Sequence, residues 1–156
     1  MLIQAEAELG HLPALPPGAL VERHAPGADI SRYYSVGAPQ APVRARLGLN
    51  HANVWLRESE RAYILSKRPN LFSDLERAIG LVLHSPLSVH RSNEDPDAYY
   101  FLCEGDTLRK AGLLHSRRTR FVDLVIARQS TAEDSYVRVI HCSPTTRNFG
   151  ARRLWP

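Results

Sequence analysis

A histidine followed by hydroxyl side chains and an arginine lies near the C-terminal end of the sequence. The segment YVRVIHCSPTTR contains His141, then Ser143 and Thr145, and it ends on Arg147. A histidine can accept or donate a proton near neutral pH, and arginine and hydroxyl side chains can bind phosphate. These groups can cleave RNA without a metal ion, because the ribose 2′-OH serves as the internal nucleophile. His51 is a second candidate for the general base or acid.

The predicted strands determine which side chains share a face with these groups. Alternation along the last strand places His141 on the same face as Val137 and Val139, and it places Cys142 on the opposite face. On the preceding strand, FVDLVIAR, Arg128 ends a row of apolar side chains. We therefore expect Arg128 at the edge of the sheet, where it could act at the phosphate group.

Several further side chains could contact the phosphates or bases of a nucleic acid. They are cationic or aromatic: Lys67, Arg61, Arg117, Arg118, Arg120 and Tyr99. Each candidate also has an ordinary structural interpretation, and both interpretations stay open. A histidine can lie at the margin of a core or in a loop, a hydroxyl-rich segment can be a turn around proline, and an arginine can simply be solvated.

The sequence lacks the motifs of several common enzyme classes. It contains no GxxxxGK[ST], GxGxxG, HExxH or GxSxG segment, which argues against nucleotide-driven enzymes, zinc proteases and α/β-hydrolases. Carboxylates are scarce in the C-terminal half, which disfavours a two-metal nuclease. Cys103 and Cys142 form no CxxC pair, so we expect two buried free thiols. No metal ion or other cofactor is expected.

Positive charge is concentrated in the last third of the chain. The 156 residues carry a net charge of +4, and 18 of the 20 basic residues are arginine. Residues 1–105 contain 10 basic and 12 acidic side chains, whereas residues 106–156 contain 10 basic and 4 acidic ones. Arginine binds phosphate in bidentate geometry and stacks on bases, so this asymmetry favours an anionic partner, above all RNA. A solvated basic face without a partner is the alternative.

Hydrophobic periodicity predicts the elements that must position these groups. Two helices are expected over 57–68 and 71–83, the second with Asn70 as its N-cap. A short strand is expected around 54–56, and a meander of four strands follows it: 87–91, 98–103, 121–128 and 136–142.

The order of these elements predicts an α+β fold. Two N-terminal helices would pack on a four-stranded, mostly antiparallel curved sheet. Residues 1–46 contain six prolines and four glycines, so we expect them to form a Pro/Gly-rich arm or lead-in. The compact domain is then expected over residues 47–156.

This layout resembles the barnase–EndoU–colicin–RelE-like (BECR) nucleases, and among them the phage-associated branch. NVWL leads into a helix that ends in SKRP, a second helix ends in LHSPLSVH, and AYYFLC, FVDLVIAR and YVRVIHCSPTT follow in order. The resemblance covers about residues 47–147. It implies a helical layer on a curved antiparallel sheet, with metal-free RNA cleavage by basic and hydroxyl side chains on the open sheet face.

The resemblance also implies positions for the site. Lys67 or Arg61 would lie on the first helix and Arg128 on the penultimate strand, with Ser143 and Thr145 after the last strand. The end motif of the family has a small residue and an aromatic residue where this chain has histidine and cysteine.

A metal-independent ribonuclease is the first functional hypothesis, acting as a toxin or phage-linked effector and leaving a 2′,3′-cyclic phosphate. The alternative is a non-catalytic phage or regulatory protein that binds RNA or protein. The expected partners are RNA and an antitoxin, immunity or host protein. A DNA-binding regulator is disfavoured because the helix at 71–83 carries only one basic residue, Arg77.

No segment reaches the roughly 18 apolar residues of a membrane span, and the N-terminus lacks a signal-peptide pattern. We therefore expect a cytoplasmic protein without membrane contact.

Overall fold

One mixed β-sheet runs through the computed structural model, which describes residues 2–4, 8–24, 30–130, 135–146 and 152–156. The strands are β1 (Leu2–Gln4), β2 (Leu20–His24), β3 (Ile30–Ser35), β4 (Val54–Arg57), β5 (Ser88–Arg91), β6 (Ala98–Glu104), β7 (Phe121–Ser130), β8 (Ser135–Thr145) and β9 (Arg153–Trp155). The helices are the 3-10 helix η1 (Leu9–His11), α1 (Ala41–Leu47), α2 (Glu58–Lys67), α3 (Leu75–His84) and α4 (Gly105–Lys110). The strand order is β1-β2-β3-β4-β8-β7-β6-β5-β9. The pairs β1–β2 and β4–β8 are parallel, and the other neighbouring pairs are antiparallel.

The described residues thus form an α+β fold with four α-helices and nine strands, so the expected four strands and two helices are wrong. The segment expected as an arm supplies β1, β2, β3 and α1. Its side chains help to build a second buried cluster against the sheet: Leu9, Val21, Tyr33, Trp55 and Tyr136. The described prolines of this segment lie outside its strands, and Pro42 occupies the first turn of α1, where a missing amide donor is tolerated.

Helix α3 forms the centre of the main core. Its apolar side chains recur every three or four residues, so Leu75, Ile79 and Val82 are buried together. Asp74 caps the helix by accepting a hydrogen bond from the backbone N–H of Arg77 at 3.1 Å. The helix therefore begins at Leu75, four residues later than expected, because the preceding residues are held by other contacts such as the isolated bridge of Phe72 to Leu114.

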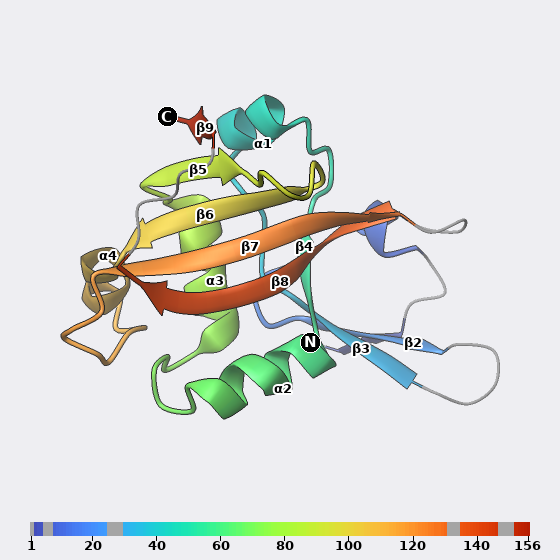
Figure 1. Ribbon diagram of the computed structural model, residues 1–156. Helices are drawn as coiled ribbons and strands as arrows, with labels where there is room; N and C mark the ends of the chain where they lie inside the picture. The colour runs from blue at the N-terminus through green and yellow to red at the C-terminus, as the bar shows by residue number, and fades with distance from the viewer. Residues whose placement is uncertain (1, 5–7, 25–29, 131–134, 147–151) are drawn as a thin grey trace.

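The helices leave one face of the central strands open. Figure 1 shows α3 behind β6, β7 and β8, whereas the face toward the viewer carries no helix in the part of the chain that is described. Helix α2 lies beside β8, and α1 lies beside β9. No helix among the described residues has the length and apolar character needed to cross a bilayer.

A bulge in β8 decides which of its side chains reach this open face. Val125 of β7 pairs with His141, but its neighbour Ile126 pairs with Val139, so Ile140 is the extra residue. Val139 and Cys142 therefore both face the main core, and His141 faces outward. The expected strict alternation, with His141 beside Val139, is wrong beyond this point.

Candidate nucleic-acid interface

A pocket of about 220 Å³ lies between the C-terminal half of α2 and the C-terminal half of β8. Its lining residues come from these two elements and the residue that follows α2: Tyr63, Ile64, Lys67, Arg68, His141, Cys142 and Ser143. Strand β4 pairs with β8 only at Val137 and Arg138, so the later residues of β8 lie at the margin of the sheet next to α2. The fold thereby brings together three residues that the sequence singled out, Lys67, His141 and Ser143.

His141 is the one group in this pocket suited to accept a proton near neutral pH. Its Nε2 atom lies 2.7 Å from the Oγ atom of Ser143, two residues along the same strand. Partial burial lowers the pKa of the imidazole below its ordinary value, because a charged ring loses hydration there. The ring is therefore neutral at pH 7 and able to act as a base.

A second histidine and serine on the same sheet face show what strand geometry alone produces. His90 Nε2 lies 2.9 Å from Ser88 Oγ on β5, in the sheet row that continues through Tyr100 and Val125 to His141. Residues two apart on a strand share a face, so such a contact forms readily. His90 is only 8% exposed, whereas His141 is more exposed and lines a pocket. The hydrogen bond is therefore common to both pairs. What distinguishes the His141–Ser143 pair from the His90–Ser88 pair is the pocket beside it and the positive charge of that pocket.

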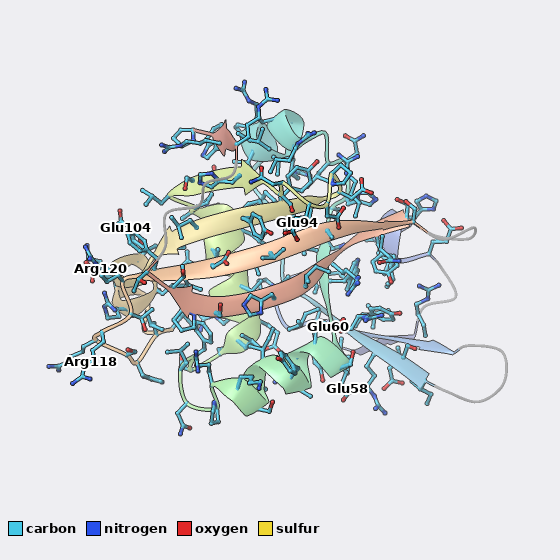
Figure 2. All side chains as sticks on the ribbon, in the orientation of Figure 1. Glu58, Glu60, Glu94, Glu104, Arg118 and Arg120 are labelled. Carbon is cyan, nitrogen blue, oxygen red and sulfur yellow. The ribbon has the colours of Figure 1, made fainter. Side chains whose placement is uncertain are left out.

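Cations extend from this pocket along one end of the molecule. One neighbouring hollow, of about 370 Å³, is lined by Arg118, Thr119, Arg120, Pro144, Thr145 and Thr146. Another, of about 480 Å³, is lined by Lys67, Arg68, Pro69, Asn70, Leu71, His115 and Ser116. In Figure 2, Arg118 points away from the sheet at this end, and Arg120 lies close to Glu104. We call the exposed cations of this region the basic rim: Lys67, Arg68, Arg117, Arg118 and Arg120.

Ion pairs with described carboxylates do not occupy the basic rim, although Glu104 is a neighbour of Arg120. None of its five cations forms an ion pair with a carboxylate that the structure describes. Four of them line hollows without an acidic residue: Lys67, Arg68, Arg118 and Arg120. Such a surface is suited to bind an anion by charge and hydrogen bonding.

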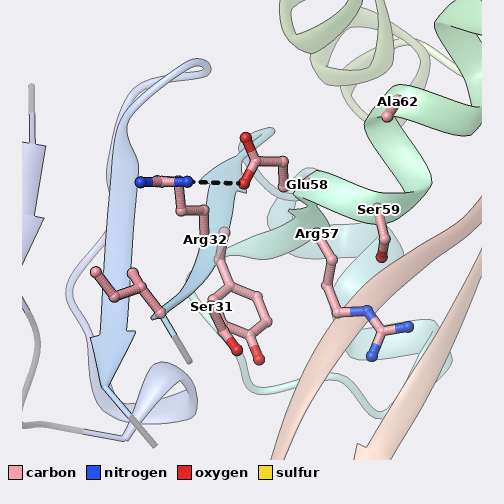
Figure 3. A pocket seen from close by; sticks show the side chains of 8 residues that line it. Ser31, Arg32, Arg57, Glu58, Ser59 and Ala62 are labelled. Atoms are coloured by element: carbon pink, nitrogen blue, oxygen red, sulfur yellow. Dashed lines mark hydrogen bonds and ion pairs between the residues drawn. The ribbon is translucent and has the colours of Figure 1, made fainter. Parts of the chain in front are cut away.

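The opposite end of α2 shows the contrasting arrangement. In the hollow of Figure 3, of about 400 Å³, Arg32 pairs with Glu58 at 3.3 Å. Glu60 accepts from Arg57 and also pairs with Arg138 at 2.9 Å. Burial alone would raise the pKa of Glu60, but hydrogen bonds from Arg57 and a neighbouring serine lower it below the usual range. These cations already have partners, so this hollow is a weaker candidate for an anion.

Two predicted site residues serve the fold. Arg128 donates through Nη2 to the carbonyl oxygens of Leu47 at 2.8 Å and Gly48 at 2.9 Å, at the end of α1. The hydroxyl of Tyr99 also donates to the Leu47 carbonyl, at 3.1 Å. Tyr99 is only 2% exposed, so the expectation that it stacks on bases is corrected. Arg128 ends its apolar row as expected, but its guanidinium closes a helix instead of facing the His141 pocket.

The remaining predicted residues lie apart from the pocket. Arg61 forms an ion pair with Glu76 and lies over the ring of Tyr34, 5.0 Å from its centroid. His51 has Nε2 at 3.0 Å from the carbonyl oxygen of Ser135, in a loop. Arg147 lies outside the described residues. The structure therefore assigns local partners to Arg61 and His51, and Thr145 joins Arg118 and Arg120 in the neighbouring hollow.

Sequence reasoning missed three residues of this region, Tyr63, Arg68 and His115. Tyr63 precedes Lys67 by one helical turn, and the Lys67 ammonium lies 5.5 Å from the centroid of its ring. Helical spacing could have linked these two residues. Arg68 and His115 come together only because the loop after α4 packs against the end of α2. This contact joins residues far apart in the sequence, so no local sequence pattern could have predicted it.

Cysteine and metal chemistry find little support in the described residues. No group of three or more His, Cys, Asp or Glu side chains is arranged there to hold a metal ion. Both cysteines are buried free thiols, as expected. Burial raises the pKa of Cys103 to about 12 and also raises that of Cys142, so both stay protonated at neutral pH.

Comparisons of this chain with protein-family models, with curated proteins and with solved structures found no significant match. The resemblance to BECR nucleases therefore stays a prediction, and the functional argument depends on the geometry of the pocket and of the basic rim.

Proposed function

We propose that this protein binds RNA along the basic rim and cleaves it at the His141 pocket without a metal ion. One observation carries the proposal. A neutral histidine lies beside a serine hydroxyl in a pocket whose only charged lining residues are the cations Lys67 and Arg68. A base next to cations is an arrangement suited to RNA transesterification, because one group can remove the 2′-OH proton while the others stabilise the charge on the phosphate.

The proposed reaction uses the ribose 2′-OH as the nucleophile. His141 Nε2 removes its proton, the 2′-oxygen forms a bond to phosphorus, and the bond from phosphorus to the 5′-oxygen breaks. Proton donation to the leaving 5′-oxygen completes the step, and the products are a 2′,3′-cyclic phosphate and a free 5′-OH. Lys67 and Arg68 stabilise the charge that develops on the phosphorane-like transition state.

Two further side chains have supporting roles in this proposal. When RNA binds, the 2′-OH replaces the Ser143 hydroxyl at His141 Nε2, and Ser143 then donates to a phosphate oxygen. His115 lines the hollow that shares Lys67 and Arg68 with the pocket, so it is the histidine placed to protonate the leaving oxygen. A base and an acid in two hollows that share the same cations would serve the two proton transfers of the reaction.

Cleavage of a single-stranded RNA by the purified protein in EDTA tests this proposal. We expect cyclic-phosphate ends from the wild type, and a loss of about 100-fold or more in His141→Ala, the range of general base catalysis. His84→Ala is the control, because His84 is exposed on α3 on the other side of the sheet. An RNA with a single 2′-deoxyribose at the cleavage site should bind but stay intact. Cleavage that persists in His141→Ala, or cutting of the deoxy substrate, contradicts the proposed reaction.

The pH dependence of cleavage gives a second test. Because burial lowers the pKa of His141, the base is available at lower pH than an ordinary histidine. On the acidic side of the pH profile, the cleavage rate should reach half its maximum below about pH 6.5, the ordinary histidine value. Binding of RNA without any cleavage across this range would leave the alternative function, a non-catalytic RNA-binding protein.

A further inference from the structure

Tyr63 is an exposed aromatic side chain at the mouth of the His141 pocket. It is 57% exposed, more than any other large hydrophobic side chain among the described residues. Its neighbour one turn along α2, Lys67, places an ammonium group 5.5 Å from the centre of the ring. An open aromatic ring beside cations is the combination that single-stranded nucleic-acid sites use for one base and its phosphate.

The pocket and the Arg118–Arg120 hollow lie in line along β8. Ser143 lines the first and Thr145 lines the second, and residues two apart on a strand are about 7 Å from each other. This distance is comparable to the separation of successive phosphates in an extended strand. Both places offer a hydroxyl group together with cations that have no described carboxylate partner.

We propose that the basic rim takes single-stranded RNA, with one base stacked on Tyr63 and successive phosphates in the His141 pocket and in the Arg118–Arg120 hollow. This inference rests on the proposed RNA function and specifies its substrate. In an A-form duplex the bases stack on one another and present no free face to a side chain. An unpaired RNA segment, in contrast, has a base free to stack on Tyr63. Its sugar–phosphate backbone is also flexible enough to lie along β8.

Fluorescence anisotropy with a labelled 12-nucleotide RNA of 2′-O-methyl riboses tests this inference, since that RNA has no 2′-OH and is not cleaved. We expect the single strand to bind at least 10-fold more tightly than its own duplex. Tyr63→Ala should weaken binding of the single strand about 5-fold to 150-fold, since one stacked base contributes about 1–3 kcal/mol. Tyr63→Phe keeps the ring and should stay within about 2-fold of the wild type. Leu87→Ala is the matched control, because Leu87 is another exposed apolar side chain, 41% exposed, outside the basic rim.

The outcomes separate the two proposals. A tighter duplex, or unchanged binding by Tyr63→Ala while the protein still binds and cleaves RNA, overturns the single-strand inference and leaves the proposed function intact. Failure of the wild type to bind any RNA overturns both.

Discussion

The number of cations in the basic rim predicts how strongly RNA binding should depend on salt concentration. Each cation that neutralises a phosphate releases counterions, so the logarithm of the binding constant falls with the logarithm of salt concentration by about 0.7 per contact for single strands. If all five cations of the rim make one contact each, the slope is about −3.5. Affinity should then fall about 130-fold between 50 and 200 mM salt.

Removing two of these cations should change the slope by a predictable amount. In Lys67→Gln/Arg68→Gln three contacts remain, so the slope becomes less steep, about −2.1. The same change in salt concentration then weakens binding only about 18-fold. The assay is fluorescence anisotropy of the labelled 2′-O-methyl RNA at five or more salt concentrations. The measured slope does not require knowledge of the preferred sequence, because phosphate contacts are sequence-independent.

A charge-matched control separates local contacts from net charge. Arg46→Gln/Arg77→Gln also removes two positive charges, from exposed positions on α1 and α3. We expect its slope to equal that of the wild type. If both double variants change the slope equally, the RNA is held by diffuse positive charge, and the assignment of phosphate contacts to the basic rim is refuted.

Three further predictions concern stability and thiol reactivity. Arg128→Met removes the hydrogen bonds that close α1, so it should lower the free energy of unfolding by about 2–3 kcal/mol in urea titrations; an unchanged midpoint would contradict this structural role. Asp74→Ala should cost about 1 kcal/mol in the same assay and Asp74→Ser much less, because only serine keeps a cap for α3. Cys103 and Cys142 should resist iodoacetamide at pH 8 in the folded protein, since burial raises both pKa values above that pH. Rapid labelling before urea is added would show that the thiols are accessible.

Local signals in the sequence predicted the central elements well. The apolar spacing in α3 and the β-branched and aromatic runs of β6 and β7 depend on neighbours a few residues away, so they can be recognised without the fold. The N-terminal strands could not be recognised in this way. β3 is stabilised by pairing with β4, from Tyr33–Arg57 to Ser35–Trp55, across a connection that contains α1. The many prolines of residues 1–46 led to the prediction of an arm without regular strands, although the described prolines lie outside the strands.

The sequence suggests a kind of chemistry for the candidate site, and the fold decides which of the suggested residues lie together. His141, Ser143 and Lys67 were chosen because a proton acceptor, a hydroxyl group and a cation suit phosphate chemistry, and the packing of α2 against β8 joins them. Arg128 and Tyr99 had equally suitable chemistry. The fold instead turns both toward the end of α1, because the carbonyl groups of a helix end need donors. Residue type therefore identifies candidates, and tertiary contacts decide between a site and a structural role.

The bulge at Ile140 is the feature on which the site depends most. With strict alternation, His141 would follow Val139 into the main core, and Cys142 would face outward. The apolar side chains that enter the core are instead spaced by two and then by three residues: Val137, Val139 and Cys142. A β-bulge allows this spacing, because it leaves one residue of β8 without a partner on β7. Ile140, 38% exposed, takes that place. Because Ile140 stays 38% exposed, part of the about 1.5–3 kcal/mol that full burial of such a side chain provides is not gained there. The same shift by one residue puts His141 and Ser143 on the outer face, where α2 supplies the cations, so the irregularity in the strand is what creates the pocket.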